Sequence, residues 1–360
     1  MRLGALLFVC FCLFAQRNGN EDAVKTMGSI PIKDWKPDSS LVLEEHHPLK
    51  ARYKAIDAHS HVYRRTPAEV ADWVRLMDET GVETTVILSG ATGAEFDKLV
   101  DLYLKPYPGR FQLYCGLETR DFDAPHYPQR AVAELERCYR KGARGVGELS
   151  EKGSGYGRGA QPGKRLHPDD ARLAPFWRKC AELKLPVNIH MADHPSAWRP
   201  ADNRQERSPE YQRYNQYGKN VPSYDEVLAI RDRLIDSHPQ TTFVACHFSN
   251  QGNDLRALSA ILDKFPNLHL DMSARHYEMG RQPRAAAKFL TRYRDRVLWG
   301  TDLTPDRNMY MSWWRLLETA DEYMPGPNWW RLYGLELPEA VLEQIYRGNA
   351  RRVLNWEPVK

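Results

Sequence analysis

The sequence predicts an α/β protein, a closed (β/α)8 or TIM barrel with long loops at the C-terminal face of its strands. Three observations predict it: short apolar runs, amphipathic stretches between them, and a regular alternation of the two over about 300 residues. This alternation is typical of parallel strands in one sheet with helices packed outside. A doubly wound open sheet is the alternative.

Eight short apolar runs are candidate strands. They cover residues 54–61, 83–90, 110–118, 143–150, 185–192, 241–249, 267–274 and 296–304. The candidate helices lie between them, at residues 67–80, 94–105, 128–141, 170–184, 223–237, 253–264 and 282–294. Several of these helices end at a glycine or close to a proline, as at Gly81, Gly142 and Pro239, which is typical of helix C-termini.

Three connections are longer than a turn requires. They are residues 150–167, 191–222 and 303–336, and the last contains Trp313, Trp314, Trp329 and Trp330. Each follows a strand, so in a barrel all three would lie at the C-terminal mouth. Long loops at that face usually build or cover a site, although simple decoration of the fold is the alternative.

The N-terminal residues have a different character from the rest. Residues 1–17 hold one early positive charge and then an apolar run, which predicts a signal peptide and an exported protein. Residues 18–53 are polar and contain prolines, so we expect an arm in which His46 and His47 are solvated. The barrel would then occupy residues 54–360. No second stretch is long and apolar enough to span a bilayer.

Charge and cysteine content exclude some classes of function. The net charge of the 360-residue chain is only +4 and there is no block of Lys and Arg, so we expect no nucleic-acid partner. The four cysteines outside the apolar start have no CxxC spacing: Cys115, Cys138, Cys180 and Cys246. We expect buried free thiols, although an exported chain could pair two of them. A homo-oligomer is left open.

Polar residues stand at the ends of several candidate strands. The stretch "AIDAHSHVY" places Asp57, His59 and His61 at alternate positions. Four later strands end in Glu148, His190, His247 and Asp302. Burying so many ionisable groups around one axis is costly unless a cation compensates, and imidazole and carboxylate are ligands of divalent metals. These strand ends therefore predict a metal site, with Asp57 orienting one of the ligands.

The motifs "DAHSH", "NIH", "ACHFSN", "WGTDLTP" and "EQIYRGNARRVL" resemble the amidohydrolase superfamily, specifically the amidohydrolase-related (family 2) hydrolases and decarboxylases. The resemblance spans about residues 54–355. It implies a catalytic divalent metal, zinc first and manganese or iron as alternatives, as one ion or two. The implied ligands are His59, His61, His190 and Asp302, joined by Glu148 as a bridging or substrate-binding group. A carboxylated lysine is excluded unless Lys152 replaces it.

The metal site predicts an enzyme with a small-molecule substrate. Our first expectation is a hydrolase in which metal-activated water cleaves an amide or lactone, with Asp302 moving the proton and His247 stabilising the oxyanion. The expected substrate contacts are His194, Trp198, Asn250 and Arg275. Arg275 could clamp a carboxylate, which would favour the alternative, a non-oxidative decarboxylase. A non-catalytic metal-binding or carbohydrate-binding protein is the third alternative.

Overall fold

The computed structural model describes residues 28–156, 165–207, 214–326 and 330–354. It divides into two compact units, residues 1–43 and 44–360. In the first unit the described part contains one short 3-10 turn, η1 (Ile32–Asp34), and the predicted signal segment lies outside the described residues. Within the described ranges, no helix has the length and apolar character needed to cross a bilayer. All that follows concerns the second unit.

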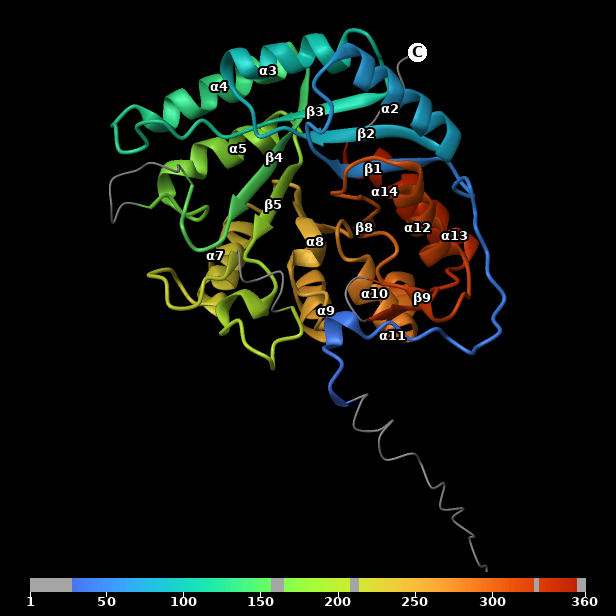
Figure 1. The fold of residues 1–360 in the computed structure, drawn as a ribbon. Helices are drawn as coiled ribbons and strands as arrows, with labels where there is room; N and C mark the ends of the chain where they lie inside the picture. Colours follow the sequence, from blue (N-terminus) through green and yellow to red (C-terminus); the bar gives the residue numbers. More distant parts are fainter. Residues whose placement is uncertain (1–27, 157–164, 208–213, 327–329, 355–360) are drawn as a thin grey trace, which may run out of the picture. The chain divides into compact units, whose positions relative to one another are not determined.

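Eight parallel strands form the barrel, in chain order around the ring (Figure 1). They are β1 (Ala55–Ser60), β2 (Val82–Leu88), β3 (Phe111–Cys115), β4 (Ala143–Glu151), β5 (Val187–Met191), β6 (Phe243–Ala245), β7 (Leu268–Asp271) and β8 (Val297–Leu298). Every neighbouring pair from β1 to β8 is parallel. The predicted (β/α)8 barrel is confirmed, and the alternative of a doubly wound open sheet is wrong.

The seam between β8 and β1 closes without a long ladder. The backbone N–H of Ala58 donates to Trp299 O at 3.0 Å, and that of Asp302 donates to His59 O at 2.9 Å. The carboxylate of Asp57 adds to this by accepting from the backbone N–H of Thr301 at 3.0 Å and from its hydroxyl at 2.8 Å. Asp57 therefore fastens the first strand to the residues after the last one.

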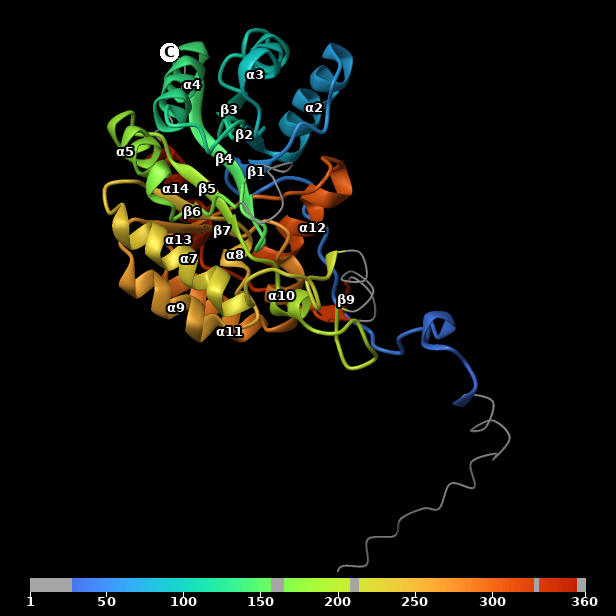
Figure 2. The ribbon, with the colours of Figure 1, turned by 90° about the vertical axis from the view of Figure 1, so that its left-hand side faces the viewer.

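Helices surround the barrel (Figure 2). The longer ones are α2 (Pro67–Thr80), α3 (Gly93–Leu99), α4 (Tyr127–Lys141), α5 (Ala174–Glu182), α7 (Tyr224–Ser237), α9 (Leu255–Lys264), α11 (Pro283–Arg292) and α12 (Arg307–Glu318). The short ones are α8 (Cys246–Ser249), α10 (His276–Arg281), α13 (Glu339–Glu343) and α14 (Asn349–Val353). Helix α2 shows why the ends of a helix could be predicted from the sequence: Thr66 and Glu69 form a capping box at its start, and Gly81 ends it at φ 90°.

The connection 303–336 is not simply a mouth loop. Its first half is α12, whose N-cap Asp306 accepts from the N–H of Met309 at 2.9 Å. Trp313 and Trp314 lie on this helix and are fully buried in the core, with the ring of Trp314 tilted against Trp299 at 4.7 Å. The prediction that these two indoles belong to an aromatic loop is therefore wrong. Trp330 is 39% exposed, and Trp329 lies outside the described residues.

A buried carboxylate anchors the segment that precedes β1. The side chain of Asp321 accepts from the backbone N–H of His46 at 2.8 Å, and its other oxygen lies 2.6 Å from the Nδ1 atom of the same histidine. Arg315 Nε donates to Asp321 at 2.5 Å. The His46 side chain is 52% exposed, as expected of a solvated histidine, and its ring in addition meets this carboxylate, which is only 1% exposed.

We expect Asp321→Asn to cost about 2 kcal/mol of unfolding free energy near pH 5 and almost none near pH 2. Burial acts to raise the pKa of Asp321, but the hydrogen bonds from His46 and Arg315 outweigh it and lower the pKa to about 2. A depressed carboxyl pKa stabilises the fold above the unfolded value near 4, and this contribution is lost as the pH falls towards 2. Urea unfolding across this range measures it. The neighbouring exposed Glu322→Gln is the control, and an equal pH profile in both variants would contradict the assignment.

Candidate metal centre

Histidine and carboxylate side chains from four segments converge at the C-terminal end of the barrel. The Nε2 atoms of His59 and His61 are 3.3 Å apart, and Asp302 Oδ1 lies 3.0 Å from the second and 3.7 Å from the first. Glu148 reaches the same space, 3.5 Å from His61 Nε2 and 3.4 Å from His247 Nε2. The structure thus brings together five of the six residues predicted from the strand ends.

Neighbouring groups fix the three imidazoles with their Nε2 atoms inward. His61 Nδ1 lies 3.0 Å from Leu88 O, and His247 Nδ1 lies 3.0 Å from Ser273 O. A carbonyl oxygen only accepts, so each Nδ1 carries the proton and each Nε2 presents a lone pair. His59 Nδ1 faces the carboxylate of Asp271 at 2.9 Å, which orients its ring in the same way. Such outer hydrogen bonds are typical of metal-ligating histidines.

The donor set fits a divalent cation. Two lone pairs at 3.3 Å repel each other unless a proton or a cation lies between them. Two ligand atoms that each lie about 2.1 Å from one zinc-sized ion are separated from each other by roughly the 3.3 Å that separates these two nitrogens. Two overlapping sets have all their donor atoms within 4.8 Å of one another: His59 with His61 and Asp302, and His59 with Glu148 and His247. The cluster therefore fits one ion or two.

The pKa values show the same need for positive charge. Burial acts to lower the pKa of His59, but the carboxylates of Asp271, Asp302 and Glu148 outweigh it and raise the pKa to about 10. Burial acts to raise the pKa of Glu148, yet His190, His247 and His59 hold it well below its usual range. The pKa of Asp302 is lowered as well, against burial, first by His59 and then by His61 and His247. Both carboxyls are therefore ionised at neutral pH.

His190 lies beside the cluster rather than in either ligand set. Its Nδ1 is 2.5 Å from Glu148 Oε1, and its Nε2 is 3.1 Å from Asp193 Oδ1. Lys152 Nζ donates to the same Asp193 oxygen at 2.8 Å. Both nitrogens of the predicted ligand His190 thus face carboxylates. Lys152 is engaged with Asp193 outside the cluster, so it does not take the place of Glu148.

Glu148 is placed by the glycine before it. Gly147 has φ +150°, and a Cβ atom at this position would lie 2.8 Å from the Cβ of Asn188 on β5. Only glycine fits both the backbone conformation and the close approach of the two strands. The sequence "GVGE" therefore lets β4 turn Glu148 towards the centre.

A left-handed turn presents His247. The predicted strand 241–249 is wrong beyond Ala245, where the backbone turns through α8. His247, Phe248, Ser249 and Asn250 all have φ between 51° and 58°. Each non-glycine residue in this region costs about 1–2 kcal/mol, and such strain is usually concentrated at functional sites. The hydrogen bond from His247 N to Asp271 Oδ1 at 3.0 Å helps to hold the turn.

Two of the expected substrate contacts form a linked pair near the centre. Asn250 Nδ2 donates to Met191 O at 3.2 Å and to Ala192 O at 3.0 Å, and Asn250 Oδ1 accepts from Arg275 Nη2. The amide of Asn250 thus holds Arg275 in place, and its own contact with a substrate stays a prediction. Arg275 Nε lies 3.9 Å from the buried Glu278, which also accepts from Arg207 Nη1 at 3.1 Å.

The other two expected contacts are structural in this conformation. His194 caps η4 (Pro195–Trp198), and its Nδ1 accepts from the N–H of Ser196 at 3.2 Å. Burial, together with Arg207 and Arg275, lowers the pKa of His194 to about 3, so the ring is neutral. Trp198 donates from Nε1 to Pro222 O at 3.0 Å and packs edge-on against Tyr224.

Sequence reasoning missed two residues that organise the site. Asp271 ends β7 and binds His59, His247 and Ser273, and the Ser273 hydroxyl lies 3.1 Å from His59 Nδ1 and 2.8 Å from His247 Nδ1. Asp271 had the pattern that identified the others, a charged residue that closes an apolar strand. Ser273 had no such pattern, because serine after a strand is ordinary loop composition.

Several solved structures share this fold. A 2,6-dihydroxybenzoate decarboxylase complexed with 2,6-dihydroxybenzoate matches with TM-score 0.53 and 19% identity, covering 84% of this chain and 100% of that one. A dihydroxybenzoic acid decarboxylase from Polaromonas with bound manganese matches with TM-score 0.54 and 18% identity, covering 84% and 97%. A 5-carboxyvanillate decarboxylase from Novosphingobium aromaticivorans, also with manganese, matches with TM-score 0.54 and 15% identity, covering 87% and 100%.

The match at the level of sequence covers nearly the whole second unit. No curated protein matches the chain. A family model described as amidohydrolase matches residues 44–356, which include every strand of the barrel and all the residues of the metal centre. The chain therefore belongs to the amidohydrolase family.

Proposed function

We propose that the protein is a metal-dependent, non-oxidative decarboxylase of a hydroxylated aromatic carboxylic acid. The observation that carries the proposal is a buried arginine, Arg275, which Asn250 holds and whose charge acts on His247 of the cluster. A cationic clamp beside a metal centre suits a substrate with a carboxylate. The benzoate and vanillate decarboxylases of similar fold support this chemistry over the amide or lactone hydrolysis that was our first expectation.

The residues that would hold the cation are His59, His61 and Asp302, with Glu148 completing the set, and His247 Nε2 would carry a proton instead of a metal bond. When bound, a divalent cation would offset the negative charge of the substrate's carboxylate and phenolate oxygens. Two of the similar structures contain manganese, and zinc stays a prediction for this chain. Elemental analysis of the purified protein identifies the metal and its stoichiometry.

The reaction requires one proton at the ring carbon. The bond between that carbon and the carboxylate breaks, its electron pair remains on the ring carbon and is shared with the incoming proton, and CO2 leaves. His247 is placed to deliver this proton, because its Nδ1 is fixed by Ser273 and its Nε2 faces the site. Burial and His190 lower the pKa of His247, which makes its protonated form a ready donor. Asp302, at 3.8 Å, stabilises that form.

We expect Arg275→Gln to raise KM for an aromatic acid at least about tenfold, because the charge-assisted hydrogen bonds to its carboxylate are lost. Arg275→Lys should recover only part of the affinity, since an ammonium group does not bind a carboxylate bidentately. Arg281→Gln is the control: Arg281 ends α10, the helix that Arg275 precedes as N-cap, and its guanidinium pairs with Glu206. Equal KM values for the Arg275 and Arg281 variants would contradict the clamp.

A substrate screen tests the proposed function itself. The manganese-loaded and zinc-loaded proteins are incubated with 2,6-dihydroxybenzoate, 5-carboxyvanillate and related acids, and released CO2 is measured beside the decarboxylated phenol. Amides and lactones of the same ring systems are the comparison set. CO2 release that disappears in His59→Ala supports the proposal. Turnover confined to the amides or lactones would overturn it and favour hydrolysis.

We further propose that the protein is exported, on the basis of the apolar start of the sequence. Fractionation of cells that express the full chain tests this, with mass spectrometry of the mature N-terminus. A protein that stays in the cytoplasm with its first residues intact would overturn the proposal.

A further inference from the structure

A tyrosine that follows the first two candidate ligands also reaches the metal centre. Tyr63 comes two residues after His61, and its backbone N–H donates to His61 O at 2.8 Å. This hydrogen bond closes a three-residue turn. The ring of Tyr63 packs edge-on against the imidazole of His61, with 5.9 Å between the ring centroids. The hydroxyl of Tyr63 donates to Asp302 Oδ1 at 3.2 Å. The phenol therefore contacts two of the candidate ligands.

The oxygen that Tyr63 contacts is the one that faces the pair of histidines. Asp302 Oδ1 lies 3.0 Å from His61 Nε2 and 3.7 Å from His59 Nε2. The other oxygen, Oδ2, lies 3.8 Å from His247 Nε2. An ionised carboxylate only accepts hydrogen bonds, and each of its oxygens has two lone pairs. The hydroxyl of Tyr63 thus occupies one lone pair of Oδ1 and leaves the other for a cation.

The carboxylate of Asp302 needs a contact that sets its orientation. Asp302 lies beyond the end of β8, its φ is 52°, and its side chain is 24% exposed. The last torsion of an aspartate side chain has a broad, roughly two-fold preference. Rotation about it exchanges the two oxygens unless a neighbouring group distinguishes them. The hydroxyl of Tyr63 is such a group, because it bonds to Oδ1.

Neighbouring contacts hold Tyr63 in this place. Arg64 Nη2 donates to Pro305 O at 2.9 Å, and Arg64 O accepts from the hydroxyl of Tyr103. The ring of Tyr63 is partly buried and packs against the hydrophobic core. Since the turn, the ring and the next residue are all fixed, little conformational entropy is left to lose when the hydroxyl bonds to Asp302.

We propose that Tyr63 is a positioning residue of the metal centre, which directs Oδ1 of Asp302 towards the cation and Oδ2 towards His247. Hydrogen bonds to metal-ligating side chains commonly change metal affinity by about 10-fold to 100-fold. A second consequence rests on the proposed function, in which Asp302 stabilises the protonated form of His247. Loss of the hydroxyl should therefore weaken metal binding and also slow turnover.

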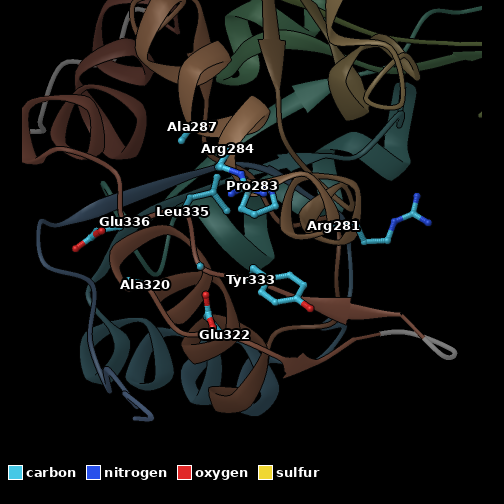
Figure 3. A pocket seen from close by; sticks show the side chains of 10 residues that line it. Arg281, Pro283, Arg284, Ala287, Ala320, Glu322, Tyr333, Leu335 and Glu336 are labelled. Atoms are coloured by element: carbon cyan, nitrogen blue, oxygen red, sulfur yellow. The ribbon is translucent and has the colours of Figure 1, made fainter. Parts of the chain in front are cut away.

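Calorimetric titration of the metal-free full chain with manganese(II) chloride tests the first effect. Tyr63→Phe removes one oxygen atom and keeps the ring, and we expect it to weaken manganese binding at least about 10-fold. Tyr333→Phe is the matched control and should leave the affinity unchanged. Tyr333 lines a separate groove of about 560 Å3 beside Arg281 and Glu322 (Figure 3), and none of the described residues that line this groove is a candidate ligand. Equal affinities in the two variants would overturn the inference.

Turnover at saturating manganese tests the second effect. We expect Tyr63→Phe to lower kcat for the aromatic acid about 10-fold and to change KM less than about twofold, because Arg275 still holds the substrate's carboxylate. A change confined to KM would overturn the role in positioning Asp302.

The two measurements also separate this inference from the proposed function. The titration requires no substrate, so it decides the role of Tyr63 whether or not the aromatic acids are decarboxylated. A chain that binds manganese more tightly than its Tyr63→Phe variant but releases no CO2 would support the positioning role and contradict the decarboxylase.

Discussion

Asp302→Asn should reduce kcat/KM for the aromatic acid that serves as substrate by about 10³-fold, the largest effect we expect from a single isosteric change. The amide keeps the shape of the side chain but loses the charge that lies 3.0 Å from His61 Nε2 and 3.8 Å from His247 Nε2. It also turns a pure acceptor into a group with two N–H donors. A cation would lose a ligand, and a protonated His247 would lose its partner.

The control for this variant lies four residues further along. Asp306→Asn makes the same chemical change at an exposed N-cap, where asparagine serves nearly as well as aspartate. Its activity should equal that of the unaltered protein. Metal content measured on both variants shows whether the loss arises from the missing ion or from the proton transfer. Full activity in Asp302→Asn would contradict the assignment of the whole centre.

Asp271→Ala should lower the free energy of unfolding by about 3–5 kcal/mol and abolish activity. Its carboxylate is fully buried and accepts from the backbone N–H of His247 at 3.0 Å, from the N–H of Ser273 at 3.1 Å and from the ring of His59 at 2.9 Å. Alanine would leave these donors without an acceptor. Burial acts to raise the pKa of Asp271, but His59 and the other donors lower it to about 2, so the charge is present at every working pH.

Asp271→Asn separates the fold from the chemistry. Its amide oxygen still accepts from the backbone, so most of the stability should be retained, while its N–H2 group would face His59 Nδ1 and disturb the tautomer of that ring. We expect metal affinity to fall by about 10-fold to 100-fold. Asp295→Ala, at an exposed position before β8, is the control and should change stability by less than about 0.5 kcal/mol. Denaturant unfolding and metal titration measure both effects. An equally small effect of Asp271→Ala would contradict its role.

The fold and most of the metal cluster followed from one sequence pattern. A charged or imidazole group that closes an apolar run identified His59, His61, Glu148 and Asp302, because parallel strands bring their C-terminal ends to one face. The same pattern led to His190, which the structure places one step away from the cluster. A pattern of this kind reports the end of a strand, and it does not report how far the side chain reaches.

Two features required the structure because local sequence opposes them. The residues that follow Ala245 favour a strand, and only the contacts of His247 with Asp271 and Ser273 stabilise the left-handed turn. Trp313 and Trp314 belong to a connection that is long and polar enough to be mistaken for a loop. Their burial depends on the packing of α12 against the barrel, which no short stretch of sequence encodes.

The hydrogen bonds of Asp57 across the seam between β8 and β1 have a consequence for the local opening of the barrel. We expect local opening of the barrel to begin where the strands are held by the fewest hydrogen bonds. This is the seam between β1, which carries His59, and the two-residue strand β8, which Asp302 follows. An ion bound by both His59 and Asp302 would hold the two sides of the seam together. Deuterium uptake at the amides of Thr301 and Asp302 should therefore slow as the ion binds, while amides on the far side of the ring keep their rates.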